Sequence, residues 1–103
     1  MIGFIVRYTI SKVLCEEDGT YKDDCFVPEM ITEHFCADFN DALKEYGEHL
    51  KTHKNQAWYP GYIHDSENNK VFFRIVHEGR YNWYVYKTVL QIEQCFYDKK
   101  DAG

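Results

Sequence analysis

The chain has 103 residues, a formal net charge of -5 at neutral pH and 45% hydrophobic residues, with only two prolines and six glycines. This composition is too apolar for a disordered chain, and the length suits a single compact domain over residues 1–103. No apolar run approaches the roughly 18 residues that span a bilayer, and the N-terminus lacks the features of a signal peptide. We therefore expect a globular cytoplasmic protein without a leader, whose four cysteines are reduced.

The N-terminal part of the chain predicts a β-hairpin. Residues 2–11 alternate between two faces and are rich in β-branched and aromatic side chains, which is typical of a strand. Asp18-Gly19 is a tight-turn pair, so a returning strand is expected within residues 20–35. Because Pro28 cannot donate to a β-ladder, we expect this strand to lie at an edge and to be bulged or interrupted near Pro28.

Residues 38–54 give the strongest helix prediction. At about 100° per residue, the large apolar side chains fall within a sector of roughly 60° and define the expected core face. Asp38 or Asn40 can cap the N-terminus of this helix, and basic residues follow at its C-terminus. The expected core-facing residues are Phe39, Leu43, Tyr46 and Leu50.

The C-terminal half predicts a β-meander. A short aromatic strand is broken at Pro60-Gly61, and residues 71–77 and 81–90 form a hairpin joined by Glu78-Gly79-Arg80. Adjacent strand residues point to opposite faces, so Phe72 and Phe73 are expected to face opposite ways. Residues 89–97 suit a strand or a helix, and residues 98–103 a frayed tail. The predicted fold is α+β, with one helix on an antiparallel sheet of about four to five strands in the order β-β-α-β-β-β.

The spacing of Cys36, His49 and His53 matches the second half of a Cys2His2 zinc finger. The first cysteine of such a finger is missing, and helix phase places both histidines at the margin of the apolar face. A thiolate at Cys36 with a neighbouring histidine is the best nucleophile available, but no glycine-rich phosphate loop, HExxH or GxSxG motif accompanies it. We expect no enzyme, no metal and no cofactor, and keep a small zinc-binding domain or enzyme as the third hypothesis.

The charge distribution is the strongest functional signal. Residues 1–50 carry eleven acidic and four basic side chains, whereas residues 51–103 carry six acidic and eight basic ones. Acids on the hairpin and its edge strand can bind a basic partner or can protect the edge from pairing, and these two roles predict the same residues. The candidate partner-binding acids are Glu16, Glu17, Asp18, Asp23, Asp24, Glu29 and Glu33.

The aromatic and basic residues of the C-terminal meander offer a second hypothesis. Aromatic side chains flanked by cations can stack and hold single-stranded nucleic acid. The candidates are Tyr59, Tyr62, Arg80, Tyr81 and Trp83. Cross-strand aromatic pairs that stabilise the sheet explain the same pattern, so nucleic acid is the less favoured partner.

The leading hypothesis is a non-enzymatic protein-binding module. An acidic domain rich in tyrosine and without catalytic motifs suits docking on a basic protein surface, where charge speeds encounter and aromatic side chains anchor it. In size, charge and missing motifs the chain is similar to small phage-encoded inhibitors and bacterial immunity proteins, which block nucleases or other nucleic-acid machinery. That resemblance involves no matching residues, and it implies an inhibitor of a nucleic-acid-handling protein.

Overall fold

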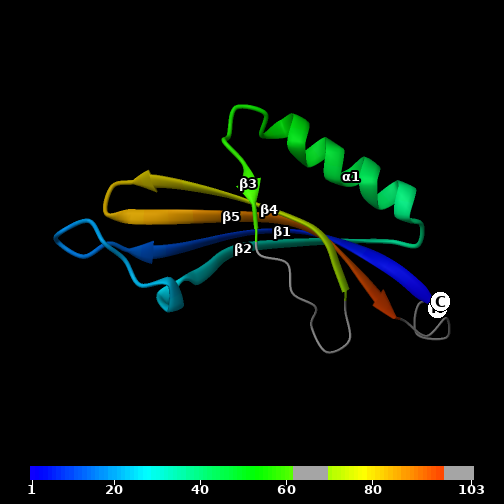
Figure 1. Ribbon diagram of the computed structural model, residues 1–103, viewed down its shortest axis with the longest axis horizontal. Coiled ribbons are helices and arrows are strands. Elements are labelled where there is room, and N and C mark those ends of the chain that lie inside the picture. Colours follow the sequence, from blue (N-terminus) through cyan, green and yellow to red (C-terminus); the bar gives the residue numbers. More distant parts are fainter. Residues whose placement is uncertain (62–69, 97–103) are drawn as a thin grey trace.

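The computed structural model describes residues 1–61 and 70–96, which form one antiparallel sheet and one α-helix (Figure 1). Within these residues the five strands lie in the order β2-β1-β5-β4-β3, and all neighbouring pairs are antiparallel. The predicted α+β class and the element order are therefore confirmed. The elements are β1 (Ile2–Leu14), the 3₁₀ turn η1 (Asp23–Cys25), β2 (Val27–Cys36), α1 (Phe39–Thr52), β3 (Tyr59–Pro60), β4 (Lys70–Tyr81) and β5 (Tyr84–Phe96).

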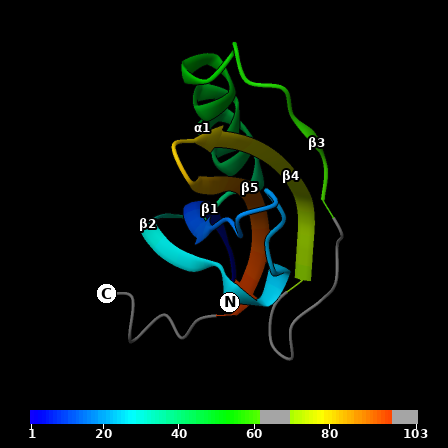
Figure 2. The same ribbon diagram turned by 90° about the vertical axis from the view of Figure 1, so that its left-hand side faces the viewer.

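Helix α1 covers one side of the sheet, which we call the helix face (Figure 2). The main core lies between α1 and the two central strands, because alternate residues of β1 and β5 point toward the helix. Val6, Leu90 and Ile92 are almost completely buried there, and Tyr8 is 4% exposed. Ala42 of α1 is also fully buried, and its small side chain allows the helix to pack closely on the sheet.

The connection between β1 and β2 covers part of the other side of the sheet, which we call the opposite face. The Tyr21 hydroxyl donates to Glu78 Oε2 at 3.2 Å, and Lys87 Nζ lies 4.3 Å from the centroid of the Phe26 ring. Val13 and Val85, whose side chains point to this face, are 5% and 2% exposed. The hairpin end of the sheet therefore has its buried residues on the face that α1 does not cover.

The helix begins where the sequence predicts, and three of its four expected core residues, Phe39, Tyr46 and Leu50, pack against the core. Asp38 is the N-cap, and its Oδ1 accepts a hydrogen bond from the Asn40 backbone N–H at 2.7 Å. Leu43, the fourth expected core residue, is 38% exposed, whereas Ala42, which was not expected there, is fully buried. The expectation for Leu43 is wrong because it considered only the angular positions of the large apolar side chains. Such positions do not show that a small residue, here Ala42, allows the helix to approach the sheet closely.

The hairpin between β4 and β5 turns later than the sequence analysis predicts. The glycine of the predicted turn, Gly79, lies inside β4 and pairs with Tyr86. The turn is formed by Asn82 and Trp83, and Asn82 has a φ of 57°, in the left-handed region that asparagine tolerates better than most residues. The predicted turn at Glu78-Gly79-Arg80 is therefore wrong.

A bulge also corrects the expectation for the two adjacent phenylalanines of β4. The register with β5 shifts between Val71 and Phe73, so the simple alternation of faces breaks at this point. The Phe72 ring lies 5.6 Å and the Phe73 ring 6.3 Å from the ring of Phe39, measured between centroids. Both rings therefore contact the first residue of α1 instead of facing opposite ways.

The remaining strand predictions agree with the structure where it describes them. β2 is an edge strand, and its pairing with β1 shifts where Met30 and Pro28 oppose Ile10 and Ser11. Residues 89–96, left open between strand and helix, continue β5. The predicted tail at residues 98–103 lies outside the described residues.

Candidate protein-binding surface

Two hairpin turns meet at one end of the sheet, on the left in Figure 1. The Cys15 backbone N–H donates to the Trp83 carbonyl at 2.7 Å, which joins the β1–β2 connection to the β4–β5 turn. Arg80 Nη1 donates to the Gly19 carbonyl at 2.9 Å, a second link between the two turns. The acidic turn and the aromatic turn, more than 60 residues apart in the chain, therefore form one continuous surface.

This end of the molecule exposes large apolar and aromatic side chains. Leu14 is 59%, Val27 60%, Tyr81 69% and Trp83 69% exposed. Leu14 and Tyr81 both pair with Tyr84 on the helix face, beyond the last turn of α1, so the helix leaves them uncovered. We name the following residues the hairpin-end surface: Leu14, Glu16, Glu17, Asp18, Val27, Tyr81, Trp83 and Tyr84.

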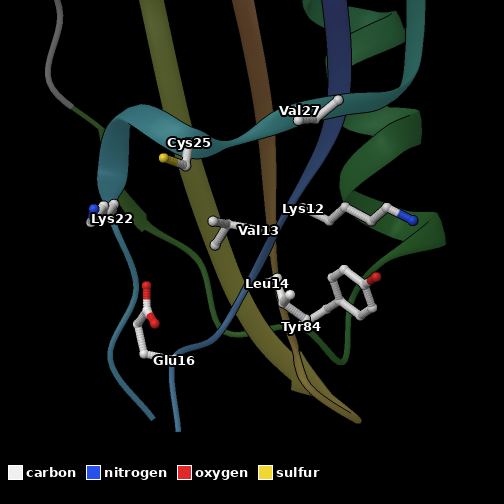
Figure 3. Close-up of a pocket in the computed structure, with 8 residues that line it drawn as sticks. All are labelled: Lys12, Val13, Leu14, Glu16, Lys22, Cys25, Val27 and Tyr84. Carbon is white, nitrogen blue, oxygen red and sulfur yellow. The ribbon is translucent and has the colours of Figure 1, made fainter. Parts of the chain in front are cut away.

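A pocket of about 460 Å³ opens within this surface (Figure 3). The pairing of β1 with β2 ends at Lys12 and Val27, so the edge of β1 beyond Lys12 is open on that side. Figure 3 shows the pocket residues arranged around this open edge. The lining residues are Lys12, Val13, Leu14, Glu16, Lys22, Cys25, Val27 and Tyr84.

The turn beside the pocket is mainly acidic, whereas the charged residues that line the pocket itself are Lys12, Lys22 and Glu16. The five acids predicted for the β1–β2 connection are all exposed. Cations near this surface are Lys12 and Lys22, which line the pocket, and Arg80, which is bonded to Gly19. The Asp18 carboxylate accepts hydrogen bonds from the Thr20 hydroxyl at 2.6 Å and the Thr20 N–H at 3.0 Å, and these bonds lower the pKa of Asp18. Gly19 has a φ of 83°, which a glycine adopts without strain. The exposed acids are Glu16, Glu17, Asp18, Asp23 and Asp24.

The other two predicted acids lie apart from this surface. Glu29 Oε1 is 3.6 Å from Lys12 Nζ, and Glu33 Oε1 is 3.1 Å from Arg7 Nε. Both are on β2, and each is partly neutralised by a cation of β1. The structure therefore divides the seven predicted acids into three groups. Glu16, Glu17 and Asp18 are at the hairpin end, and Glu29 and Glu33 are on the edge strand. Asp23 and Asp24 are in η1, where Asp23 lines a separate pocket with Arg7, Arg74 and Lys87.

Sequence reasoning missed an ion pair between the adjacent strands β1 and β5, in which the carboxylate is buried. Arg7 Nη2 lies 2.8 Å from Oε1 of Glu93, which is only 3% exposed, and Gln91 donates to the other carboxylate oxygen of Glu93 at 3.2 Å. The position of Arg7 in the middle of an apolar strand was the sign in the sequence that could have indicated such a pair. Its partner could not be identified because the pairing of β1 with β5 is not local in sequence.

The aromatic and basic candidates do not form one platform. Tyr59 is on β3 and pairs with Val76, and burial together with the Glu78 carboxylate raises the pKa of Tyr59. Tyr62 lies outside the described residues. Arg80 is bonded to Gly19, so only Tyr81 and Trp83 stand exposed at the hairpin turn, next to the acids.

The histidines of the candidate zinc motif pack on a tyrosine. The rings of His49 and His53 stack on the Tyr8 ring, with centroids 5.2 and 5.1 Å apart, so they belong to the packed face and not to its margin. Cys36 is buried. Its burial is the main cause of the raised pKa of its thiol, and the nearby carboxylates of Glu45 and Asp41 raise this pKa further. In the part of the chain that the structure describes, no group of three or more His, Cys, Asp or Glu side chains is arranged to hold a metal ion.

Comparison with protein-family models, with curated proteins and with solved structures finds no match for this chain. Among the described residues, no helix has both the length and the apolar character needed to cross a membrane.

Proposed function

We propose that this chain is a non-enzymatic protein-binding module that docks through its hairpin-end surface on a basic surface of another protein. The observation that carries this proposal is the exposure of Leu14, Val27, Tyr81 and Trp83 beside a turn rich in carboxylates. Contiguous apolar groups with a polar rim mark interaction surfaces, and Trp and Tyr are the residues most enriched among binding hot spots.

The charge of the same surface supports a basic partner. Glu16, Glu17 and Asp18 project from the turn next to the exposed aromatic side chains. Such an arrangement lets electrostatic attraction speed the encounter, while burial of the aromatic rings supplies affinity. The pocket beside Leu14 has room for a side chain of the partner.

The chemistry of this surface favours a protein partner over nucleic acid. Phosphate groups are repelled by carboxylates, and the candidate cation Arg80 is already bonded to Gly19. Proteins that handle nucleic acids present basic surfaces of the kind that would attract this turn. The role we propose is therefore that of a cytoplasmic inhibitor, which occupies the nucleic-acid-binding surface of its target.

The test is affinity purification of the tagged chain from its native host, followed by the same experiment with Tyr81→Ser/Trp83→Ser. We expect the wild-type chain to retain one stoichiometric protein with a basic surface. The double variant should lose about tenfold or more in affinity, because truncation of one hot-spot aromatic costs about 2 kcal/mol.

Phe96 provides a matched control for this experiment. It is 66% exposed, similar to Tyr81 and Trp83, and it lies at the other end of β5. Phe96→Ser should retain the partner in full. Equal loss with Phe96→Ser, or purification of nucleic acid in place of a protein, would rule out the proposed role of the hairpin-end surface.

A further inference from the structure

The pocket in the hairpin-end surface lies against a short unpaired length of strand β1. Pairing of β1 with β2 ends at Lys12 and Val27, and β1 continues to Leu14 with no strand on that side among the described residues. The chain before Val27 belongs to η1 and the β1–β2 connection, so β2 does not follow β1 to its end (Figure 3). The pocket therefore occupies the position that a longer β2 would fill.

The hydrogen bonds of β1 show which backbone groups face the pocket. The Cys15 N–H donates to the Trp83 carbonyl, so the backbone groups of Cys15 point toward β5. The backbone groups of adjacent strand residues point to opposite sides, so the N–H and C=O of Leu14 point away from β5 and toward the pocket. In an antiparallel pair one residue can bond to both groups, so a short antiparallel segment is sufficient.

The side chains around this position are mainly apolar. Leu14 is 59% and Val27 60% exposed. Tyr84 pairs with Leu14 in the sheet and also lines the pocket. An apolar side chain placed beside Leu14 would remove these groups from water, which is favourable.

The charges of the lining residues are balanced. Lys12 Nζ lies 3.6 Å from Glu29 Oε1 and 4.9 Å from the centroid of the Tyr84 ring, so its charge is already engaged. The two other charged lining residues, Lys22 and Glu16, have opposite signs. Because burial of an unpaired charge is costly, the pocket favours an uncharged apolar side chain.

The side of the pocket toward the β1–β2 turn is acidic. Beyond Leu14 the chain enters the turn with Glu16, Glu17 and Asp18, all of which are exposed. A strand rises about 3.3 Å per residue, so a segment paired with Leu14 comes beside these carboxylates within two or three residues. In an antiparallel segment these residues precede the one that pairs with Leu14, and basic side chains suit them.

We propose that the pocket binds an extended segment of the partner protein in which two basic residues stand two and three positions before an apolar residue. The apolar residue pairs with the backbone of Leu14 and places its side chain in the pocket, and the basic residues face Glu16, Glu17 and Asp18. This inference rests on the proposed function and adds to it the chemistry of the segment that the partner inserts.

A second copy of this chain, docked hairpin end to hairpin end, is a poor occupant of the pocket. Such a pair would bring Glu16, Glu17 and Asp18 of one copy close to the same carboxylates of the other. Like charges across an interface are unfavourable. Charge complementarity therefore favours a basic segment of another protein.

The test is titration of the full chain, labelled with ¹⁵N, with three capped peptides, followed by NMR. The first peptide is Arg-Lys-Thr-Leu-Thr, the second has Ser in place of Leu, and the third has the reversed sequence Thr-Leu-Thr-Lys-Arg. We expect the first to shift the amide signals of Leu14 and Val27 and to bind at least about fivefold more tightly than either of the others. All three peptides have the same charge, so attraction by charge alone predicts equal binding.

Two variants of the chain test the two parts of the site. Leu14→Ser removes the apolar contact, and Glu16→Gln/Glu17→Gln removes two carboxylates of the turn. Each should weaken binding of the first peptide by about fivefold. Glu33→Gln/Glu48→Gln is the matched control, because it makes the same change of charge on β2 and α1, away from the pocket, and should bind as the wild-type chain does.

The failure of this inference is distinguishable from failure of the proposed function. Tyr81→Ser/Trp83→Ser leaves every lining residue in place, so it should bind the first peptide as the wild-type chain does while it loses the partner protein. If affinity purification retains a partner in a Trp83-dependent manner but the peptides do not bind, only the inference about the pocket is wrong.

Three results would overturn the inference. They are equal affinity for the three peptides, absence of shifts at Leu14 and Val27, and unchanged binding in both Leu14→Ser and Glu16→Gln/Glu17→Gln. A dimer of the chain in sedimentation experiments that the first peptide dissociates would assign the pocket to a second copy instead.

Discussion

Arg7 and Glu93 give a prediction at the scale of single residues. Glu93 is buried on the opposite face and receives its charge partner from β1. Arg7→Met would leave this carboxylate buried without a counter-charge, which should lower the free energy of unfolding by about 3 kcal/mol. Arg7→Met/Glu93→Leu should recover most of that loss, because an apolar pair replaces the ion pair. Urea denaturation of the four proteins of this double-mutant cycle measures the coupling.

Glu33 provides the control for this cycle. It also binds Arg7, but its side chain is about half exposed, so Glu33→Gln should cost less than about 1 kcal/mol. If the effects of Arg7→Met and Glu93→Leu simply add in the double variant, the two residues are not coupled, and the buried pair has no special part in the stability of the sheet.

The turn between β4 and β5 gives a prediction at the scale of an element. Asn82 has a positive φ, so Asn82→Val should destabilise the protein by about 1–2 kcal/mol in urea denaturation. Gly79 lies in a strand, and a Cβ there would make only an ordinary 3.6 Å contact with His77 Nε2, so Gly79→Ala should change stability little. The reverse order of effects would place the turn at Gly79.

The same elements show what the sequence can predict. Local patterns located α1, with Asp38 as one of two candidate caps, and the edge position of β2 with its bulge near Pro28, because these features depend on neighbours in the chain. The turn between β4 and β5 was predicted in the wrong place because a glycine usually indicates a turn, whereas Gly79 lies inside β4. The convergence of the two hairpin turns could not be predicted, because it depends on the non-local pairing of β1 with β5.

At the scale of the whole molecule, the fold places acidic side chains in two regions. The hairpin end combines exposed aromatic groups with carboxylates, and the groove between β2 and α1 is lined by three carboxylates of the helix. The acidic half of the sequence contributes to both places, because it forms the first hairpin and the helix. A partner with a basic surface could therefore reach either place under the same electrostatic attraction.

The central claim is that the hairpin end is buried in the complex, and Trp83 reports on it directly. The chain has two tryptophans, Trp58, which is partly buried, and Trp83, which is 69% exposed. Labelling with 5-fluorotryptophan gives one fluorine NMR signal for each, and the solvent isotope shift of each signal measures exposure to water. We predict that the shift of Trp83 is lost on formation of the complex, whereas that of Trp58 is unchanged. A stoichiometric complex in which Trp83 keeps its full solvent isotope shift would contradict the account.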